Sequence, residues 1–188
     1  GGGHAYAQKL LGDAYEDGML GLEEDGAKAL EYYTKAADGG HASAQWRLGY
    51  VYEHGEFGLG VDEVAAFEYY KKAADDDDEC AQYAQYRLGK AYENGELGLE
   101  KNEETAFQYY QKAADGGHNH AQGLIGFAYD FGKWGKEKDG AKALEYYQKA
   151  AGGGDAGVAA AGAAAAVTGA GITGAMTACP GRLRRISS

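Results

Sequence analysis

The sequence predicts an all-α fold, a solenoid of four helix-pair repeats that ends in an irregular tail rich in alanine and glycine. Two short strings recur with the same spacing, at successive offsets of 37, 40 and 37 residues. Ala-Gln recurs at Ala7, Ala44, Ala84 and Ala121, and Lys-Ala-Ala recurs at Lys35, Lys72, Lys112 and Lys149. A repeat of this length is typical of stacked helical hairpins, which build extended binding surfaces. The pattern therefore favours a binding scaffold over an enclosed active site.

The repeats are expected to occupy residues 1–151, and a low-complexity tail follows at 152–188. The four units are expected at about 4–40, 41–77, 81–117 and 118–151. The tail begins as a further repeat would and then loses every expected Leu-Gly pair and tyrosine. It is too poor in Leu, Ile and Phe for a transmembrane helix. A disordered end, a weakly helical end and the product of a changed reading frame all fit it.

The first helix of each repeat, about His4 to Asp17 in the first unit, contains a glycine near its middle. These glycines are Gly12, Gly49, Gly89 and Gly126. Because a mid-helix glycine costs about 1 kcal/mol relative to alanine, we expect a neighbouring helix to cross there. A second glycine stands where the helix should end in a left-handed residue. These are Gly18, Gly55, Gly95 and Gly132.

The second helix, about Asp25 to Asp38 in the first unit, has one broad apolar stripe at 100° per residue. In that unit the stripe consists of Ala29, Leu30, Tyr32, Tyr33, Ala36 and Ala37. The same columns return in the other three units, so the stripe is predicted to be buried. Natural N-caps precede this helix in every unit. They are Asp25, Asp62, Asn102 and Asp139.

The repeat resembles a known family. The positions that carry the resemblance are Ala44-Gln45, Leu48-Gly49, Tyr52, Gly55, Asp62, Ala66, Tyr69 and Lys72-Ala73-Ala74. This string is similar to the Sel1-like repeat, a relative of the tetratricopeptide repeat, and all four units match it. The resemblance implies a right-handed superhelix of antiparallel helix pairs that acts as an adaptor for protein complexes. It brings no shared catalytic motif and implies no cofactor.

If the hairpins stack as in that family, the first helix of each pair lines a concave groove. Ten outward positions of these helices are the predicted partner-binding residues: Lys9, Asp13, Trp46, Tyr50, Glu53, Tyr86, Lys90, Glu93, Phe127 and Asp130. The large aromatics among them are expected to face solvent, because exposed aromatic clusters tend to mark interfaces. Glu16, Glu53, Glu93 and Asp130 are expected to add an acidic row beside them. The alternative is that the superhelix twists enough to bury these aromatics against the next repeat.

The net charge of −11 bears on the partner. Phosphate binding needs a basic face, so nucleic acid and anionic membrane surfaces are disfavoured. A protein or peptide with apolar anchors and some basic character fits better. His118, His120 and Asp115 could be imagined as a metal clip, but two histidines are too few ligands and lie in an inter-repeat loop.

The sequence therefore predicts a non-enzymatic interaction scaffold that holds a peptide or protein in its groove. One alternative is a repeat fragment of a larger membrane-anchored adaptor in endoplasmic-reticulum protein quality control. Another is a hydrolase or sugar-active protein on the same scaffold, which would need a pocket with perturbed carboxylates. The sequence does not select a compartment, and both the cytoplasm and the endoplasmic-reticulum lumen fit.

Overall fold

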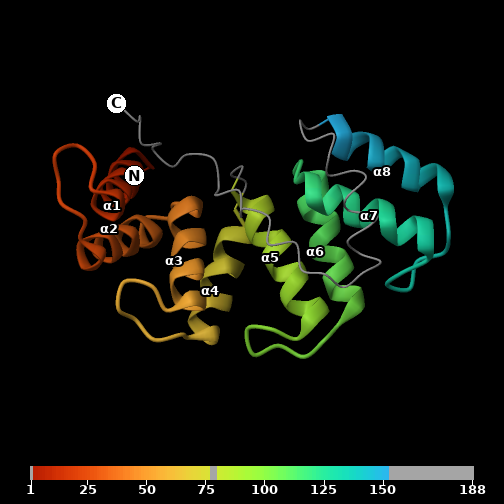
Figure 1. Cartoon of the computed structure of the whole chain (residues 1–188), viewed down its shortest axis with the longest axis horizontal. Helices are drawn as coiled ribbons and strands as arrows, with labels where there is room; N and C mark the ends of the chain where they lie inside the picture. Colours follow the sequence, from red (N-terminus) through yellow and green to blue (C-terminus); the bar gives the residue numbers. More distant parts are fainter. Residues whose placement is uncertain (1, 77–79, 153–188) are drawn as a thin grey trace. The chain divides into compact units, whose positions relative to one another are not determined.

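The computed structural model describes residues 2–76 and 80–152, and within them the chain forms eight helices and no strand (Figure 1). The helices are α1 (Gly2–Asp17), α2 (Gly26–Asp38), α3 (Ala42–His54), α4 (Glu63–Ala74), α5 (Ala81–Asn94), α6 (Glu103–Asp115), α7 (Asn119–Phe131) and α8 (Gly140–Gly152). Helices pack in consecutive pairs, α1 with α2, α3 with α4 and α7 with α8, while α2 also packs against α3 and α6 against α7. The predicted all-α solenoid of helix pairs is confirmed. The predicted tail, apart from Gly152, lies outside the described residues.

The chain divides into two compact units, and the division falls inside α5, after Ala84. The first unit holds α1 to α4, and the second holds most of α5 together with α6, α7 and α8. Each unit is described by itself below.

The second helices begin at the predicted N-caps. In each case a side-chain oxygen accepts the backbone N–H three residues later, which satisfies a donor that the helix itself leaves unpaired. The distances are 3.0 Å for Asp25 to Lys28, 2.9 Å for Asp62 to Ala65, 2.9 Å for Asn102 to Thr105 and 3.0 Å for Asp139 to Lys142. The local sequence therefore sets where these helices start.

The loops inside each repeat place an apolar residue in the left-handed region. These residues are Leu20, Phe57, Leu97 and Trp134, with φ between 51° and 59°. A non-glycine residue pays roughly 1–2 kcal/mol for this conformation. Packing offsets the cost at two of these positions, because Phe57 lies against the core of the first unit and Trp134 against that of the second, whereas Leu20 is 79% exposed. The loops begin as predicted, since Gly55 and Gly132 end their helices at a φ of 66°.

A tyrosine ring lies across the middle of each first helix, where the glycines were predicted to admit a neighbour. The nearest ring carbon would be 2.6 Å from a Cβ at Gly12, 2.7 Å at Gly49, 2.6 Å at Gly89 and 2.8 Å at Gly126. The rings belong to Tyr33, Tyr70, Tyr110 and Tyr147 of the second helices. Only glycine leaves room for such a ring, so the close crossing is confirmed.

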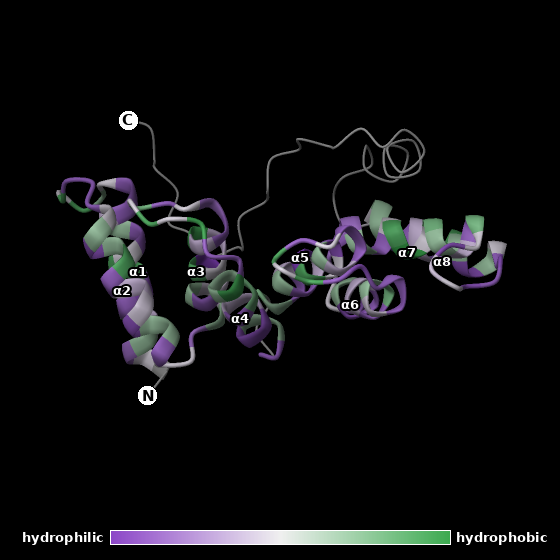
Figure 2. Cartoon of the chain, turned by 90° about the horizontal axis from the view of Figure 1, so that it is seen from below, coloured by the Kyte–Doolittle hydropathy of each residue, from purple (hydrophilic) through white to green (hydrophobic). Residues whose placement is uncertain are grey.

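Each unit has its own core along the predicted stripe. In the first unit the buried cluster joins Ala29, Tyr33, Ala36 and Ala37 of α2 to Ala44 and Leu48 of α3. In the second it joins α6 residues, with Tyr110 fully buried, to Ala121, Ile125 and Ala128 of α7. Hydrophobic and hydrophilic positions alternate along the helices (Figure 2). Apolar burial of this kind contributes roughly 25 cal/mol per Å², so these two clusters stabilise the contacts of α2 with α3 and of α6 with α7.

Candidate binding surface

The outward face of α3 carries a ladder of stacked aromatic rings in the first unit. The rings of Trp46 and Tyr50 are 6.0 Å apart, and those of Tyr50 and His54 are 4.0 Å apart. The three residues are spaced i, i+4 and i+8, which places them on one side of the helix. Trp46 and Tyr50 are partly exposed, and His54 is exposed. We name these three residues the α3 ladder.

Arg47 holds the ladder from the side. Its guanidinium lies 2.6 Å from an oxygen of Glu16 on α1 and 2.6 Å from an oxygen of Glu56 in the following loop. It also lies 5.2 Å from the ring centroid of Tyr50 and 5.3 Å from that of Phe57. Burial alone would lower the pKa of Arg47, but hydrogen bonds and charge attraction from Glu16 and Glu56 outweigh burial and raise that pKa. The guanidinium is therefore positively charged, and it lies within cation–π distance of the Tyr50 ring.

Lys9 and Asp13 do not face solvent, and in this respect the sequence prediction was wrong. Lys9 is 4% exposed and Asp13 is 2% exposed. Their side chains form an ion pair of 2.8 Å within α1, and Asp13 accepts the hydroxyl of Tyr33 at 2.9 Å. Tyr33, which crosses α1 at Gly12, contacts a face of α1 that the sequence analysis had placed toward solvent. Both charges are thus used inside the first unit, where pairing compensates for their burial.

The acidic row also has internal partners. In each repeat the crossing tyrosine donates to the acidic residue 17 positions earlier in the chain. The distances are 2.6 Å for Tyr33 to Glu16, 2.7 Å for Tyr70 to Glu53, 2.7 Å for Tyr110 to Glu93 and 3.4 Å for Tyr147 to Asp130. These carboxylates were predicted to face a bound partner. In the structure each of them accepts a hydrogen bond from a tyrosine hydroxyl of its own repeat. Asp130, with the longest bond, is the exposed member.

The buried tyrosines remain protonated donors. Desolvation is the largest cause that raises the pKa of Tyr33 and of Tyr110, and the adjacent carboxylates raise both further. Asp13 and Glu16 act on Tyr33, and Glu93 acts on Tyr110. A protonated hydroxyl bonded to a carboxylate is a charge-assisted hydrogen bond, which is stronger than a neutral one.

In the second unit, Tyr86 forms part of a cluster of aromatic rings. It is partly exposed and stacks on His118, with 4.4 Å between the ring centroids and 14° between the planes. Its centroid is 5.8 Å from that of Tyr110 and 6.2 Å from that of His120. Burial, with a smaller contribution from His120, lowers the pKa of His118 to about 4. His118 is therefore neutral at pH 7, and its Nδ1 accepts the N–H of Ala121 at 3.3 Å as the N-cap of α7.

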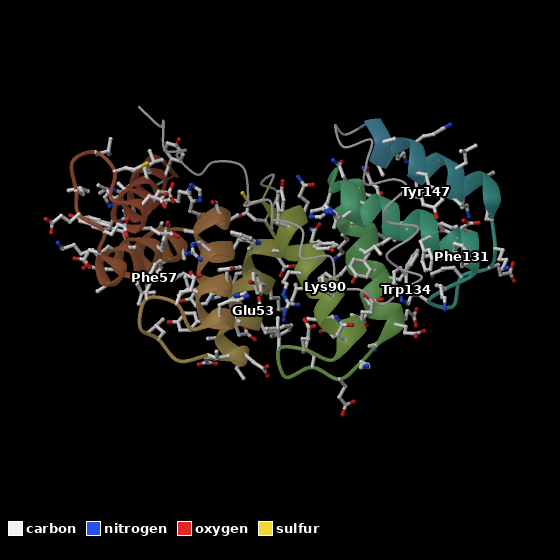
Figure 3. The ribbon with its side chains drawn as sticks, viewed as in Figure 1. Glu53, Phe57, Lys90, Phe131, Trp134 and Tyr147 are labelled. Atoms are coloured by element: carbon white, nitrogen blue, oxygen red, sulfur yellow. The ribbon has the colours of Figure 1, made fainter. Side chains whose placement is uncertain are left out.

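Lys90 and Phe127 complete the predicted set in the second unit. Lys90 is partly exposed on α5 (Figure 3). Phe127 is 7% exposed, so the prediction that it faces solvent was wrong. Its ring lies 4.6 Å from that of Phe131, one turn further along α7, and Phe131 is 45% exposed. Phe131 is therefore the accessible aromatic residue at this end of α7. The sequence analysis missed it because it placed the exposed aromatic at Phe127, one helical turn earlier.

The comparison with known families decides what kind of repeat this is. The profile of the Sel1 repeat matches residues 5–41, 42–78, 82–118 and 119–155. The chain belongs to the Sel1 repeat family. The resemblance inferred from the sequence is confirmed, and each matched unit contains one hairpin of the described helices.

Solved structures of Sel1 proteins are similar to this chain. A Sel1 repeat protein from Oxalobacter formigenes is 38% identical with a TM-score of 0.70, and the match covers 82% of this chain and 59% of that one. The protein c5321, described as a protective antigen present in uropathogenic Escherichia coli strains displaying an SLR fold, is 30% identical with a TM-score of 0.43 over 90% of this chain and 42% of that one. The chain thus spans less than two thirds of either structure. A comparison with curated proteins gives no match.

The described Sel1 repeats contain no group of three His, Cys, Asp or Glu residues arranged to hold a metal ion. This includes the site imagined at His118, His120 and Asp115, where His118 caps α7. Across the same described residues, no helix combines the length and the apolar character that crossing a membrane requires.

Proposed function

We propose that this Sel1 array is a non-enzymatic scaffold that binds a protein or peptide through the outward faces of its first helices. Sel1 repeats typically bind proteins, and this chain belongs to that family. The observation that supports binding at this face is the α3 ladder, in which the rings of Trp46 and Tyr50 stack on one another and are partly exposed. Aromatic side chains pre-organised in this way are the commonest anchors of protein interfaces.

The partner we propose is a segment with apolar or aromatic anchors and some basic character. Trp46 and Tyr50 offer flat apolar surface in the first unit, and Tyr86 offers such a surface in the second, and both suit such anchors. The net charge of −11 favours approach by a positively charged segment. The internal bond of Glu93 to Tyr110 uses part of the accepting capacity of that carboxylate. Since an ionised carboxylate accepts at more than one lone pair, Glu93 still suits a basic side chain.

The test is selection of binding peptides from a displayed library by the full chain, followed by titration of the best peptide by calorimetry. The double variant Trp46→Ala/Tyr50→Ala should weaken binding at least tenfold while its circular dichroism stays unchanged. Tyr32→Ala is the matched control, because Tyr32 is also partly exposed and stacks on a neighbouring ring, that of Tyr15, but belongs to a second helix. Equal peptide affinities of the double variant and the wild type would show that the α3 ladder is not part of the binding site.

A further inference from the structure

A lysine of the second helix lies over a stacked pair of tyrosines in the first repeat. The rings of Tyr15 on α1 and Tyr32 on α2 have 5.6 Å between their centroids and 8° between their planes. The Nζ of Lys28 lies 5.0 Å from the ring centroid of Tyr15 and 3.2 Å from a carboxylate oxygen of Asp25. The ring attracts the ammonium group through its quadrupole, and the carboxylate attracts it through its charge.

The fourth repeat holds a lysine in the same way. The Nζ of Lys142 lies 5.0 Å from the ring centroid of Tyr129 and 3.6 Å from a carboxylate oxygen of Asp139. Tyr129 stacks on Tyr146, with 6.2 Å between the centroids. In both repeats the aspartate is the residue that caps the second helix. Two separate repeats therefore use a tyrosine and a capping aspartate to hold an ammonium group.

The second repeat has the same tyrosine pair and the same capping aspartate, but its lysine position is Ala65. Tyr52 stacks on Tyr69 with 5.6 Å between the centroids and 5° between the planes. One carboxylate oxygen of Asp62 accepts the N–H of Ala65 at 2.9 Å. Among the residues that the structure describes, no ammonium or guanidinium group lies over the Tyr52 ring, and none forms an ion pair with Asp62.

A backbone hydrogen bond holds the capping residue beside its tyrosine in each repeat. The N–H of Asp62 donates to the carbonyl of Tyr52 at 2.9 Å, and the corresponding bonds of the first and fourth repeats are 2.9 Å and 2.8 Å. The tyrosine and the carboxylate of the second repeat are therefore held together as in the repeats that contain the lysine. Tyr52 and Ala65 are partly exposed and Asp62 is exposed, so this place is accessible from solvent.

We propose that Tyr52 and Asp62 form an open site for the ammonium group of a lysine side chain on a protein partner. The chain itself shows the chemistry of the ligand, because its own Lys28 and Lys142 occupy this place in the first and fourth repeats. The net charge of −11 favours the approach of a cation. The site shares no residue with the α3 ladder, and only the choice of a protein as the partner rests on the proposed function.

The third repeat lacks the carboxylate and serves as an internal contrast. Its tyrosine pair, Tyr92 and Tyr109, stacks with 5.6 Å between the centroids. Its lysine position is Thr105, and its capping residue is the neutral Asn102. Because a ring alone attracts an exposed cation only weakly, the proposal assigns no site to this repeat.

The test is an NMR titration of the full chain with a blocked lysine, Nα-acetyl-lysine amide, at constant ionic strength. The Tyr52 ring and the Ala65 amide should shift saturably. The Nε-acetylated form of the same compound should shift neither group, because acetylation removes the charge. This probe contains no peptide anchor, so its failure would count against the ammonium site, whereas the α3 ladder is judged by its own peptide titration.

Three variants sharpen the test, and each introduces a residue type that another repeat already has at that position. Ala65→Lys fills the site from within and should weaken binding of the blocked lysine at Tyr52 at least fivefold. Asp62→Asn keeps an N-cap but removes the charge, and it should weaken binding to a similar extent. Thr105→Lys is the matched control, because it adds the same charge as Ala65→Lys in the repeat without the carboxylate, and it should bind like the wild type.

The proposal would be overturned by a Tyr52 ring that does not shift with the blocked lysine, or that shifts equally with the Nε-acetylated form. Wild-type affinity in Ala65→Lys or in Asp62→Asn would also overturn it.

Discussion

Gly49 and Gly123 both lie inside first helices, and they should respond to alanine in opposite ways. A Cβ at Gly49 would lie 2.7 Å from a ring carbon of Tyr70, whereas nothing lies within 4 Å of one at Gly123. Gly123→Ala should stabilise the chain by up to about 1 kcal/mol through helix propensity. Gly49→Ala should destabilise it by about 1–3 kcal/mol, because the tyrosine ring must shift in a packed core. Urea unfolding monitored by circular dichroism measures both, and a stabilised Gly49→Ala would contradict the crossing.

The tyrosine–carboxylate bonds should matter in proportion to their burial. Tyr110→Phe removes the donor to Glu93 and should cost about 1–3 kcal/mol, because a carboxylate loses its partner in a partly buried place. Tyr147→Phe is the control, with a bond of 3.4 Å at an exposed site, and should change stability by less than about 0.5 kcal/mol. Thermal unfolding compares the two, and equal effects would argue against a stabilising role for the buried bond.

His118 should make stability depend on acid. Because burial lowers its pKa to about 4 in the folded chain, the unfolded chain binds the proton first as pH falls. The stabilisation is fully present above the ordinary histidine pKa of 6.5 and is lost between there and pH 4. His118→Asn keeps a good N-cap without the titration, so its melting temperature should fall less over this window than that of the wild type. Parallel pH profiles for the two proteins would contradict this.

At the scale of single helices, the N-caps set where the second helices begin. Asn102 accepts the N–H of Thr105 at 2.9 Å, so Asn102→Ala should cost about 1 kcal/mol and Asn102→Asp should cost little. Hydrogen exchange should localise the loss to the first turn of α6. Unchanged exchange in Asn102→Ala would show that neighbouring contacts, and not the cap, fix this helix start.

The helices were predictable because the same capping residues, glycines and apolar positions recur in all four repeats. Caps and crossing glycines could be read from the sequence and are found in the structure. The predicted stripe of α2 is buried at Ala29, Tyr33, Ala36 and Ala37 but only partly buried at Leu30 and Tyr32, so the prediction that the whole stripe is buried was wrong there. The inward placement of Lys9 and Asp13 could not be read from the sequence, because a helical projection treats one helix alone. Asp13 accepts from Tyr33, which reaches across from α2, and such a contact with a second helix does not appear in a projection of α1.

At the scale of the whole molecule, the periodic sequence specifies the stacking better than the binding site. Core columns repeat, so four copies of the pattern determine them. Binding columns differ between repeats, so each position must be judged from its own neighbours. Phe127 is buried and lies beside Phe131, whereas Trp46 and Tyr50 stay partly exposed beside Arg47. The spacing of residues in the sequence does not show which of these aromatic side chains are buried by their neighbours.

The central claim is that a partner binds at the α3 ladder, and Trp46 can report on it directly. The chain has two tryptophans, so Trp134→Phe leaves Trp46 as the single emitter. Titration with a selected peptide should change its emission saturably, with the dissociation constant found by calorimetry. Tyr50→Ala in this background should raise that constant at least tenfold, and Tyr32→Ala should not. A peptide that binds by calorimetry yet leaves Trp46 emission constant would contradict the account.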